Sequence, residues 1–157
     1  EEALQLFMER ARRLGPKLGP VLFQLPPTQQ LDLPRPAAFL QLLEAGQRWV
    51  LEFRHPSWHT NEVYDVLARH GVALCIPVGG RLDPARITTA PFTYVRMHRG
   101  REPAGGFNPA ELRDWARQVR SLSQVGKDVY IYFNNDWEGL AIRDALALEE
   151  RLGLKAG

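Results

Sequence analysis

Two short segments of the sequence place charged side chains at the end of an apolar run. In "WVLEFRHPSW" these are Glu52 and Arg54, and in "TYVRMHRG" they are Arg96 and His98, at the same spacing. Carboxylate and imidazole groups perform general acid–base catalysis, and arginines hold anions. We therefore predict that Glu52 and His98 are catalytic. Arg54 and Arg96 would then bind an anionic substrate, and the alternative is a buried ion-pair network that only fixes the packing.

Further polar or aromatic side chains near the ends of apolar runs are predicted to contact the substrate. They are Gln24, His55, Trp58, Asn134 and Asn135. The amides and the imidazole can hydrogen-bond a ligand, whereas the Trp58 indole can stack on a sugar or a base. Packing beneath a loop is the alternative for Trp58, and closing the interior is the alternative for Gln24.

The sequence offers few ligands for a metal ion. Glu52, His55 and His98 are the evident candidates, and no HExxH-type spacing joins them. We predict that His98 is an acid–base or hydrogen-bonding residue, and we expect no cofactor, while a divalent metal ion stays open as an alternative. Cys75 lies within an apolar run with no neighbouring histidine, so we predict an inert core thiol.

The composition fits one domain of ordinary size. The 157 residues are 45% hydrophobic, and the net charge of +2 argues against a dedicated nucleic-acid coat, although it leaves room for a local basic patch. No apolar run reaches the roughly 20 residues of a membrane-spanning helix, and no signal segment opens the chain. A single cysteine fits a reducing compartment, so we predict a cytoplasmic protein without a membrane partner.

Five short runs rich in β-branched and aromatic residues predict strands. They are Val21–Leu25, Val50–Phe53, Val72–Ile76, Thr93–Met97 and Val129–Phe133. Segments with helical period predict helices at Ala3–Leu14, Pro36–Glu44, Glu62–His70, Asn108 to Gly126 and Glu138–Leu152. Strand and helix alternate at a spacing of about 30 residues, which predicts right-handed crossovers and a mainly parallel sheet.

Two helix starts carry capping residues. Asn108 is the predicted N-cap of the clearest helix, with Pro109 in its first turn and Glu111 as the capping-box partner. Asp136 or Asn135 is the predicted N-cap of the last helix.

The predicted strands have two unlike faces, because successive side chains point to opposite sides. One face is apolar throughout, whereas the other gains polar residues toward the C-terminal end in four of the five strands; Ala73 and Cys75 of the third do not follow the trend. A doubly wound sheet would need two apolar faces, whereas a (β/α)8 barrel gathers polar groups at its C-terminal mouth. The pattern predicts the barrel, but five strands cannot close one, so the chain is a partial barrel or the sheet is open.

Four segments in order resemble motifs of the family called domain of unknown function 72, the YecE-like proteins. They are "LGPVLFQLPP", "LEFRHPSW", "TYVRMHRG" and "YIYFNNDWEGLAIRDAL". The resemblance implies a TIM-type barrel of about eight strands, of which this chain would hold the fourth to the eighth. Residues 1–157 would then be a single domain that lacks the first three βα units, which agrees with a chain that begins at Glu1 instead of Met. The family has no settled reaction.

The chain departs from the family pattern at three places. Asp83 is the candidate for an aspartate that the family has after the sixth strand, and Arg99 is inserted between the family's histidine and glycine, here His98 and Gly100. Asp144 stands where the family has an asparagine in the last helix.

The segment "HRGREPAGGFN" is predicted to bind an anion. It carries Arg99, Arg101, Gly105 and Gly106, and the resemblance places it after the seventh strand. Loops after strands seven and eight are the usual phosphate position in such barrels, where a helix N-terminus assists.

These observations predict an enzyme that acts on an anionic small molecule or a phosphodiester at the mouth of the barrel. Hydrolase or lyase chemistry follows only from analogy with the fold. The alternatives are a non-catalytic module that binds a nucleic acid or a metabolite, and an inactive truncated fragment. The sequence does not predict the oligomeric state.

Overall fold

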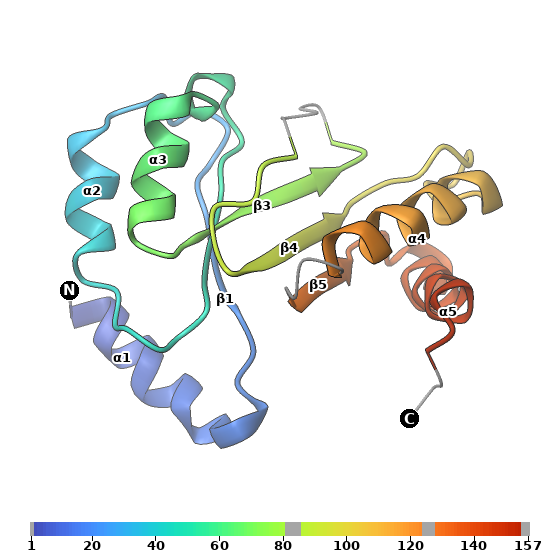
Figure 1. Cartoon of the computed structure of the whole chain (residues 1–157), viewed down its shortest axis with the longest axis horizontal. Coiled ribbons are helices and arrows are strands. Elements are labelled where there is room, and N and C mark those ends of the chain that lie inside the picture. Colours follow the sequence, from blue (N-terminus) through green and yellow to red (C-terminus); the bar gives the residue numbers. More distant parts are fainter. Residues whose placement is uncertain (1, 81–85, 124–127, 155–157) are drawn as a thin grey trace.

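The structure, a computed structural model, describes residues 2–80, 86–123 and 128–154 (Figure 1). The strands are β1 (Val21–Gln24), β2 (Trp49–Glu52), β3 (Ala73–Val78), β4 (Phe92–Met97) and β5 (Asp128–Phe133). The α-helices are α1 (Glu2–Ala11), α2 (Pro34–Leu40), α3 (Asn61–Arg69), α4 (Pro109–Ser123) and α5 (Leu140–Leu152). Short 3-10 helices are η1 (Arg12–Lys17), η2 (Pro56–Trp58) and η3 (Trp137–Gly139).

All five strands run parallel, and each pairs with the next one along the chain, in the order β1-β2-β3-β4-β5. A doubly wound sheet instead reverses its strand order at a switch point. Consecutive parallel strands joined by helical crossovers are the arrangement of a (β/α)8 barrel. The predicted fold class, five strands of a partial TIM-type barrel, is confirmed.

The helices cover one face of this sheet. In Figure 1, α1, α2 and α3 lie at one end of the molecule, and α4 and α5 lie at the other. Strand residues that point toward them, such as Leu51, Phe53, Val95 and Met97, are at most 2% exposed and belong to the two apolar clusters that include helix residues. The predicted apolar face is therefore confirmed as the face that packs on helices.

The opposite face of the sheet forms an apolar cluster of its own, which contains no residue of the described helices. Its buried members are Val50, Ala73, Cys75, Ala90, Phe92 and Tyr94. Toward the C-terminal ends of the strands this face becomes polar, with Glu52 on β2 and Arg96 on β4. The predicted division between an apolar interior and a polar mouth is confirmed.

The predicted capping box starts α4. The Asn108 side-chain oxygen accepts hydrogen bonds from the backbone N–H groups of Ala110 and Glu111, both at 3.0 Å, and a Glu111 carboxylate oxygen accepts the Asn108 N–H at 2.9 Å. These contacts satisfy N–H groups that have no partner within the helix. Gly126, the predicted end of this helix, lies outside the described residues.

The predicted start of the last helix is wrong. Neither Asn135 nor Asp136 caps it through its side chain; the α-helix begins at Leu140, and the N-cap is Gly139. Glu138 and Gly139 have φ angles of 51° and 75°, in the left-handed region, so the short η3 cannot continue directly into α5. The side chain of Asn135 is used instead in a buried contact described below.

None of the helices in residues 2–80, 86–123 and 128–154 combines the length and the apolar character that crossing a membrane requires.

Candidate functional site

The polar residues of the mouth meet around the guanidinium group of Arg96. Its Nη1 donates hydrogen bonds to Glu52 Oε2 at 2.7 Å and to Gln24 Oε1 at 2.8 Å, and its Nε donates to Asn134 Oδ1 at 2.7 Å. Arg96 of β4 therefore ties together the C-terminal ends of β1, β2 and β5. The side chains of one layer in such a barrel come from alternate strands, which explains why Arg96 passes β3 to reach Glu52.

Glu52 is the most deeply buried charged group of the site, with 1% of its surface exposed. Its Oε1 atom lies 3.1 Å from Nε of Arg54 and 3.5 Å from Nε2 of His98, within ion-pair distance. Neither contact has the alignment of a hydrogen bond, so Glu52 Oε1 and His98 Nε2 are buried atoms without a hydrogen-bond partner among the described residues. Thus Oε2 of Glu52 accepts a hydrogen bond from Arg96, whereas Oε1 accepts none from the described residues.

The surroundings of Glu52 hold its carboxylate in the ionised form. Burial alone would raise its pKa, but contacts with the His98 imidazole and the Arg96 guanidinium outweigh burial and lower the pKa to about 2. Glu52 is therefore a permanent negative charge at neutral pH, which makes it unsuitable as a proton donor.

Cys75 lies behind this carboxylate. Its Sγ atom is 3.8 Å from Glu52 Oε2, and the residue is 1% exposed. Burial first, and the negative charge of Glu52 second, raise the pKa of the thiol far above its usual range. The predicted core position of Cys75 is confirmed, and the thiol stays protonated at neutral pH.

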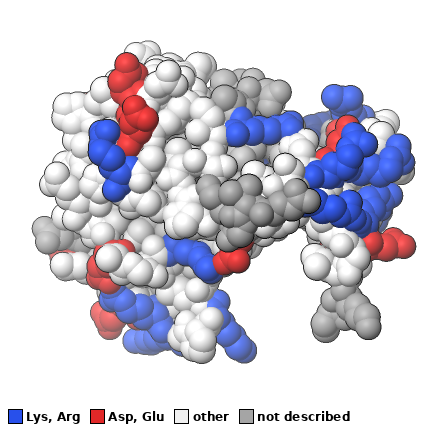
Figure 2. Space-filling model, viewed as in Figure 1, with Lys and Arg blue, Asp and Glu red and all other residues white. Residues whose placement is uncertain are grey.

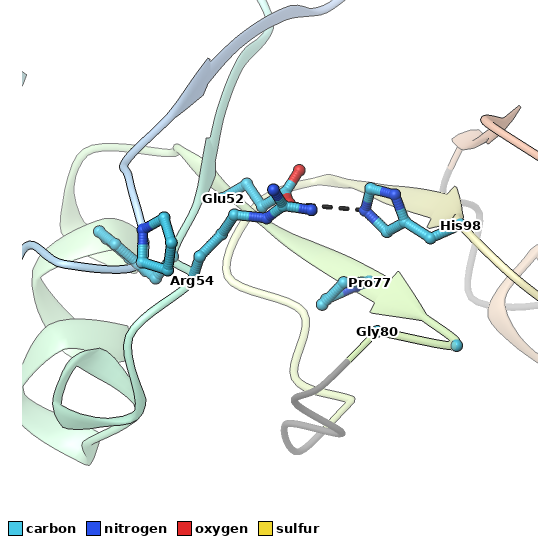
Figure 3. Close-up of a pocket in the computed structure, with 8 residues that line it drawn as sticks. Glu52, Arg54, Pro77, Gly80 and His98 are labelled. Atoms are coloured by element: carbon cyan, nitrogen blue, oxygen red, sulfur yellow. Dashed lines mark ion pairs between the residues drawn. The ribbon is translucent and has the colours of Figure 1, made fainter.

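A pocket of about 510 Å³ opens beside these groups (Figure 3). Its lining residues are Pro27, Glu52, Phe53, Arg54, Pro77, Gly79, Gly80 and His98. Its volume falls within the range of roughly 300–1,000 Å³ that is common for small-molecule sites. Our sequence interpretation named Glu52, Arg54 and His98 but missed the prolines and glycines of the lining. Pro27 follows β1, Pro77 lies within β3, and Gly79 and Gly80 follow β3.

Gly79 shapes the wall of this pocket by a close backbone approach. Its φ angle is 75°, and a Cβ atom built there would lie 1.6 Å from the backbone oxygen of Arg99. The backbone N–H groups of His98 and Arg99 both point to the oxygen of Val78, at 2.9 and 3.3 Å. A glycine is required here because the chains after β3 and β4 nearly touch.

Of the seven predicted substrate contacts, one, Arg54, lines the pocket. Gln24, Arg96 and Asn134 form the hydrogen-bonded group described above, and the other three lie elsewhere. Trp58 is fully buried, stacks on Phe53 at a ring-centroid distance of 4.7 Å and donates its indole N–H to Gln29 O at 2.7 Å. His55 caps η2 through a contact of its Nδ1 with the backbone N–H of Ser57 at 3.2 Å. For Trp58 the structure corresponds to packing beneath a loop, the alternative named above.

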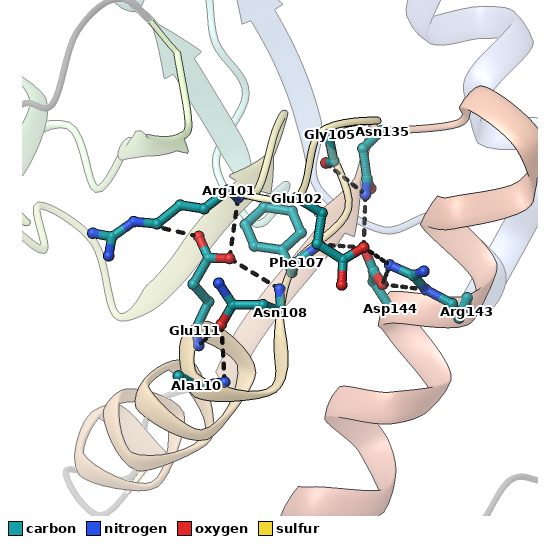
Figure 4. A network of polar contacts seen from close by, with 10 residues as sticks. All are labelled: Arg101, Glu102, Gly105, Phe107, Asn108, Ala110, Glu111, Asn135, Arg143 and Asp144. Carbon is teal, nitrogen blue, oxygen red and sulfur yellow. Dashed lines mark hydrogen bonds and ion pairs between the residues drawn. The ribbon is translucent and has the colours of Figure 1, made fainter.

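Asn135, the third of them, is buried against α5. Its Nδ2 donates to Asp144 Oδ2 at 2.7 Å, and Asp144 also accepts the Phe107 backbone N–H at 2.8 Å and the Arg143 Nε at 2.9 Å (Figure 4). Asp144 is 1% exposed, so its carboxylate is the internal anchor of the loop between β4 and α4. The only sequence signal for Asp144 was that the family has an asparagine at this position. That difference did not indicate that Asp144 anchors the loop between β4 and α4.

The predicted anion-binding loop is held together by its own charges. Arg99 donates to Pro103 O at 3.1 Å, and Arg101 lies 3.8 Å from a Glu111 carboxylate oxygen. Gly105 O accepts hydrogen bonds from Gly100 N at 2.9 Å and from the Asn135 side chain at 3.4 Å.

Gly106 of the same loop packs under an ion pair. A Cβ atom there would lie 2.2 Å from an Arg143 nitrogen and 2.4 Å from a Glu102 oxygen, and these two side chains pair at 2.8 Å. The carboxylates of Glu102, Glu111 and Asp144 thus surround the loop and weigh against an anion there. The anion-binding role of the loop stays a prediction.

The described residues contain no group of three or more His, Cys, Asp or Glu side chains placed to hold a metal ion. Within the mouth, Glu52 and His98 supply two donors, and the neighbouring Arg54 and Arg96 would repel a cation. Asp83, the candidate for the family aspartate, lies outside the described residues.

Consecutive parallel strands, helices on one face and a polar pocket at the C-terminal ends of the strands define a TIM-barrel-like protein. The family model described as "Protein of unknown function DUF72" matches residues 1–157, and the chain belongs to this family.

The relatives are longer than this chain. It is 29% identical over 169 residues to the UPF0759 protein YunF of Bacillus subtilis, an alignment that covers 88% of this chain and 59% of that relative. A crystal structure of a DUF72 family protein from Thermotoga maritima matches with a TM-score of 0.83 at 25% identity, over 97% of this chain and 65% of that one. A DUF72 family protein from Enterococcus faecalis has a TM-score of 0.83 at 22% identity, over 99% and 67%.

The chain therefore spans less than two thirds of the length of the first two of these relatives. Their match confirms the resemblance to the family and a TIM-barrel-like fold. The assignment of residues 1–157 to the last five βα units of a longer barrel stays a prediction.

Proposed function

We propose that this protein is an enzyme whose pocket, at the C-terminal ends of β2 to β4, binds a phosphate- or carboxylate-bearing small molecule. One observation carries the proposal: two arginines and a histidine surround a single ionised carboxylate beside an open pocket. Arg54 and Arg96 both contact Glu52, so the cluster keeps an excess of positive charge that favours an anionic ligand.

Arg54 is the residue that would bind the anion. Its side chain is 40% exposed, lines the pocket and faces Glu52 through Nε at 3.1 Å. This contact leaves the two terminal nitrogens of the guanidinium group to form paired hydrogen bonds with a carboxylate or phosphate. Arg96, by comparison, is 21% exposed and already donates to three side chains, so it positions Glu52.

His98 is the residue that would transfer a proton. Its imidazole lines the pocket, is 17% exposed and lies 3.5 Å from the carboxylate of Glu52. An ionised carboxylate beside an imidazole orients the ring for proton transfer. Glu52 would therefore support His98. Hydrolase or lyase chemistry remains a proposal by analogy with the fold.

Binding measurements with an anionic probe test the proposal. Titration of the 157-residue chain with inorganic phosphate or a sugar phosphate, followed by calorimetry, is expected to show saturable binding. The Arg54→Gln variant should weaken this binding at least tenfold, whereas Arg69→Gln, at an exposed position at the end of α3, should leave it unchanged. Equal affinity of the wild type and the Arg54→Gln variant would contradict the assigned role of Arg54.

Nucleic-acid binding is the second candidate, and the surface of α4 favours it. Arg113, Arg117 and Arg120 are exposed at helical spacing, and Figure 2 shows Lys and Arg side chains gathered around this end of the molecule. Binding to DNA or RNA that weakens steeply with salt and is lost on replacing these three arginines would support this candidate. A chain that binds neither probe would support the inactive fragment.

A further inference from the structure

We infer that one hydroxyl group of the ligand hydrogen-bonds to both Glu52 Oε1 and His98 Nε2, so that the site takes a polyhydroxylated anion such as a sugar or polyol phosphate. This inference rests on the proposed function, because it specifies the substrate class of the same pocket.

The first observation is a pair of polar atoms that lack partners. Glu52 is 1% exposed, and its Oε1 atom has no hydrogen-bond partner among the described residues; the same is true of His98 Nε2. Buried polar atoms are almost always hydrogen-bonded, and exceptions tend to occur where a ligand or a water molecule completes the set. Both residues line the pocket, which places the two atoms directly behind its wall.

The second observation is the placement of the two atoms. They lie 3.5 Å apart but are not aligned for a direct hydrogen bond. Figure 3 shows the carboxylate of Glu52, the guanidinium group of Arg54 and the ring of His98 close together at the edge of the pocket that they line. One small group at this edge can contact both atoms at once.

The chemistry of the two atoms limits what this group can be. Glu52 Oε1 is an ionised oxygen and only accepts, so the ligand must donate to it. A carboxylate or fully ionised phosphate oxygen carries no hydrogen to donate and would be repelled by Glu52. An ammonium group would donate, but Arg54 and Arg96 lie against the same carboxylate and disfavour another cation. A hydroxyl group donates to Glu52 and accepts from His98 in one contact.

The other parts of the pocket fit the remainder of such a ligand. Arg54 offers its terminal nitrogens to the anionic group, and Pro27 and Pro77 provide apolar surface for the C–H face of a sugar ring. A volume of about 510 Å³ accommodates a pentose or hexose phosphate. Glu52 and His98 would therefore bind the hydroxyl group, and Arg54, on an adjacent wall of the same pocket, would bind the anionic group.

Three probes separate this inference from the proposed function: inorganic phosphate, ribose 5-phosphate and neutral ribose. For the wild type we expect ribose 5-phosphate to bind at least tenfold more tightly than phosphate, and neutral ribose to bind more weakly than ribose 5-phosphate. The Glu52→Gln variant should lose the tenfold margin and bind phosphate at least as tightly as the wild type, because the substituted amide keeps the shape of the carboxylate but not its charge. The Arg54→Gln variant should bind phosphate and ribose 5-phosphate less tightly than the wild type does.

The outcomes have distinct meanings. If phosphate and ribose 5-phosphate bind equally well, the hydroxyl site is wrong and the anion site stands. If no phosphate-bearing probe binds, both fail. If the Glu52→Gln variant does not fold, the His98→Ala variant replaces it. We expect the same loss of the tenfold preference for ribose 5-phosphate over phosphate. A crystal structure with ribose 5-phosphate should place a hydroxyl oxygen within hydrogen-bond distance of both atoms, and a ligand that lies elsewhere with only water between them would overturn the inference.

Discussion

Arg96 on β4 donates a 2.7 Å hydrogen bond to the buried carboxylate of Glu52 on β2, and strand β3 lies between their two strands. The two side chains therefore meet above the sheet, on the face that none of the described helices covers. The same arginine holds Gln24 and Asn134, so the positions of three polar residues depend on one guanidinium group. An ion pair so placed positions the site and contributes to the fold at the same time.

Replacing Arg96 by leucine is expected to destabilise the protein strongly. The substitution leaves the buried carboxylate of Glu52 without its best-aligned donor, and breaking a buried pair in this way costs about 3–5 kcal/mol. The measurement is the free energy of unfolding from urea denaturation. As the control, Arg117→Ala removes an exposed ion pair with Asp114 and should change the free energy of unfolding by less than about 1 kcal/mol. Similar losses for both variants would refute the special role of Arg96.

Acid is expected to destabilise the wild type through Glu52. Its pKa is about 2 in the folded protein, below the ordinary value of 4.5, so the ionised group stabilises the fold above pH 4.5. This contribution is lost as the pH falls from 4.5 toward 2 and amounts to about 3 kcal/mol. Urea denaturation at about pH 5 and about pH 2.5 should show a larger loss for the wild type than for Glu52→Gln. Parallel losses in the two proteins would show that Glu52 is not the group responsible.

Gly79→Ala is expected to disturb the pocket far more than Gly46→Ala. Both glycines have positive φ angles, 75° and 86°, so both substitutions carry the cost of a left-handed alanine. Only at Gly79 would the new Cβ atom meet backbone, 1.6 Å from Arg99 O, whereas nothing lies within 4 Å of the one at Gly46. The difference in melting temperature between the two variants measures this collision, and equal melting temperatures would contradict it.

Asp144→Ala is expected to loosen the loop between β4 and α4. It leaves the buried Phe107 N–H without its acceptor, which costs about 1–3 kcal/mol, and leaves the Asn135 amide with only its 3.4 Å contact to Gly105 O. Hydrogen exchange of the Phe107 amide should become faster, while the amides of β2 keep their protection. Asp114→Ala, on the exposed face of α4, is the matched control and should leave the Phe107 amide unchanged.

Much of the fold could be predicted because its signals are local. The β-branched and aromatic content of short runs such as Thr93–Met97 and Val129–Phe133 is carried by neighbouring residues, and it located all five strands to within two residues. The capping box of Asn108 and Glu111 is equally local and was correct. The start of α5 was missed because positive φ angles just before Leu140 delay the helix, and an asparagine or aspartate before them resembles a cap.

The candidate site was predictable only in part. Strand parity placed Glu52 and Arg96 on the same face, but Trp58 and Asn135 were predicted to contact a ligand and are buried elsewhere. An aromatic or amide side chain after a strand has the same sequence signature whether it faces a pocket or a core. The residue that holds each side chain in place is Phe53 for Trp58 and Asp144 for Asn135. These contacts form only when the whole chain packs.

The sequence by itself determined the elements, the two faces of the strands and the family, because alternation and motifs are properties of adjacent residues. Only the tertiary structure decided that Arg96 reaches Gln24 and Glu52, which are 72 and 44 residues away. It also decided that one oxygen of Glu52, beside a pocket, has no hydrogen-bond partner among the described residues. Contacts between residues so far apart in the sequence depend on strand order, register and the curvature of the sheet. These properties arise from the packing of the whole domain.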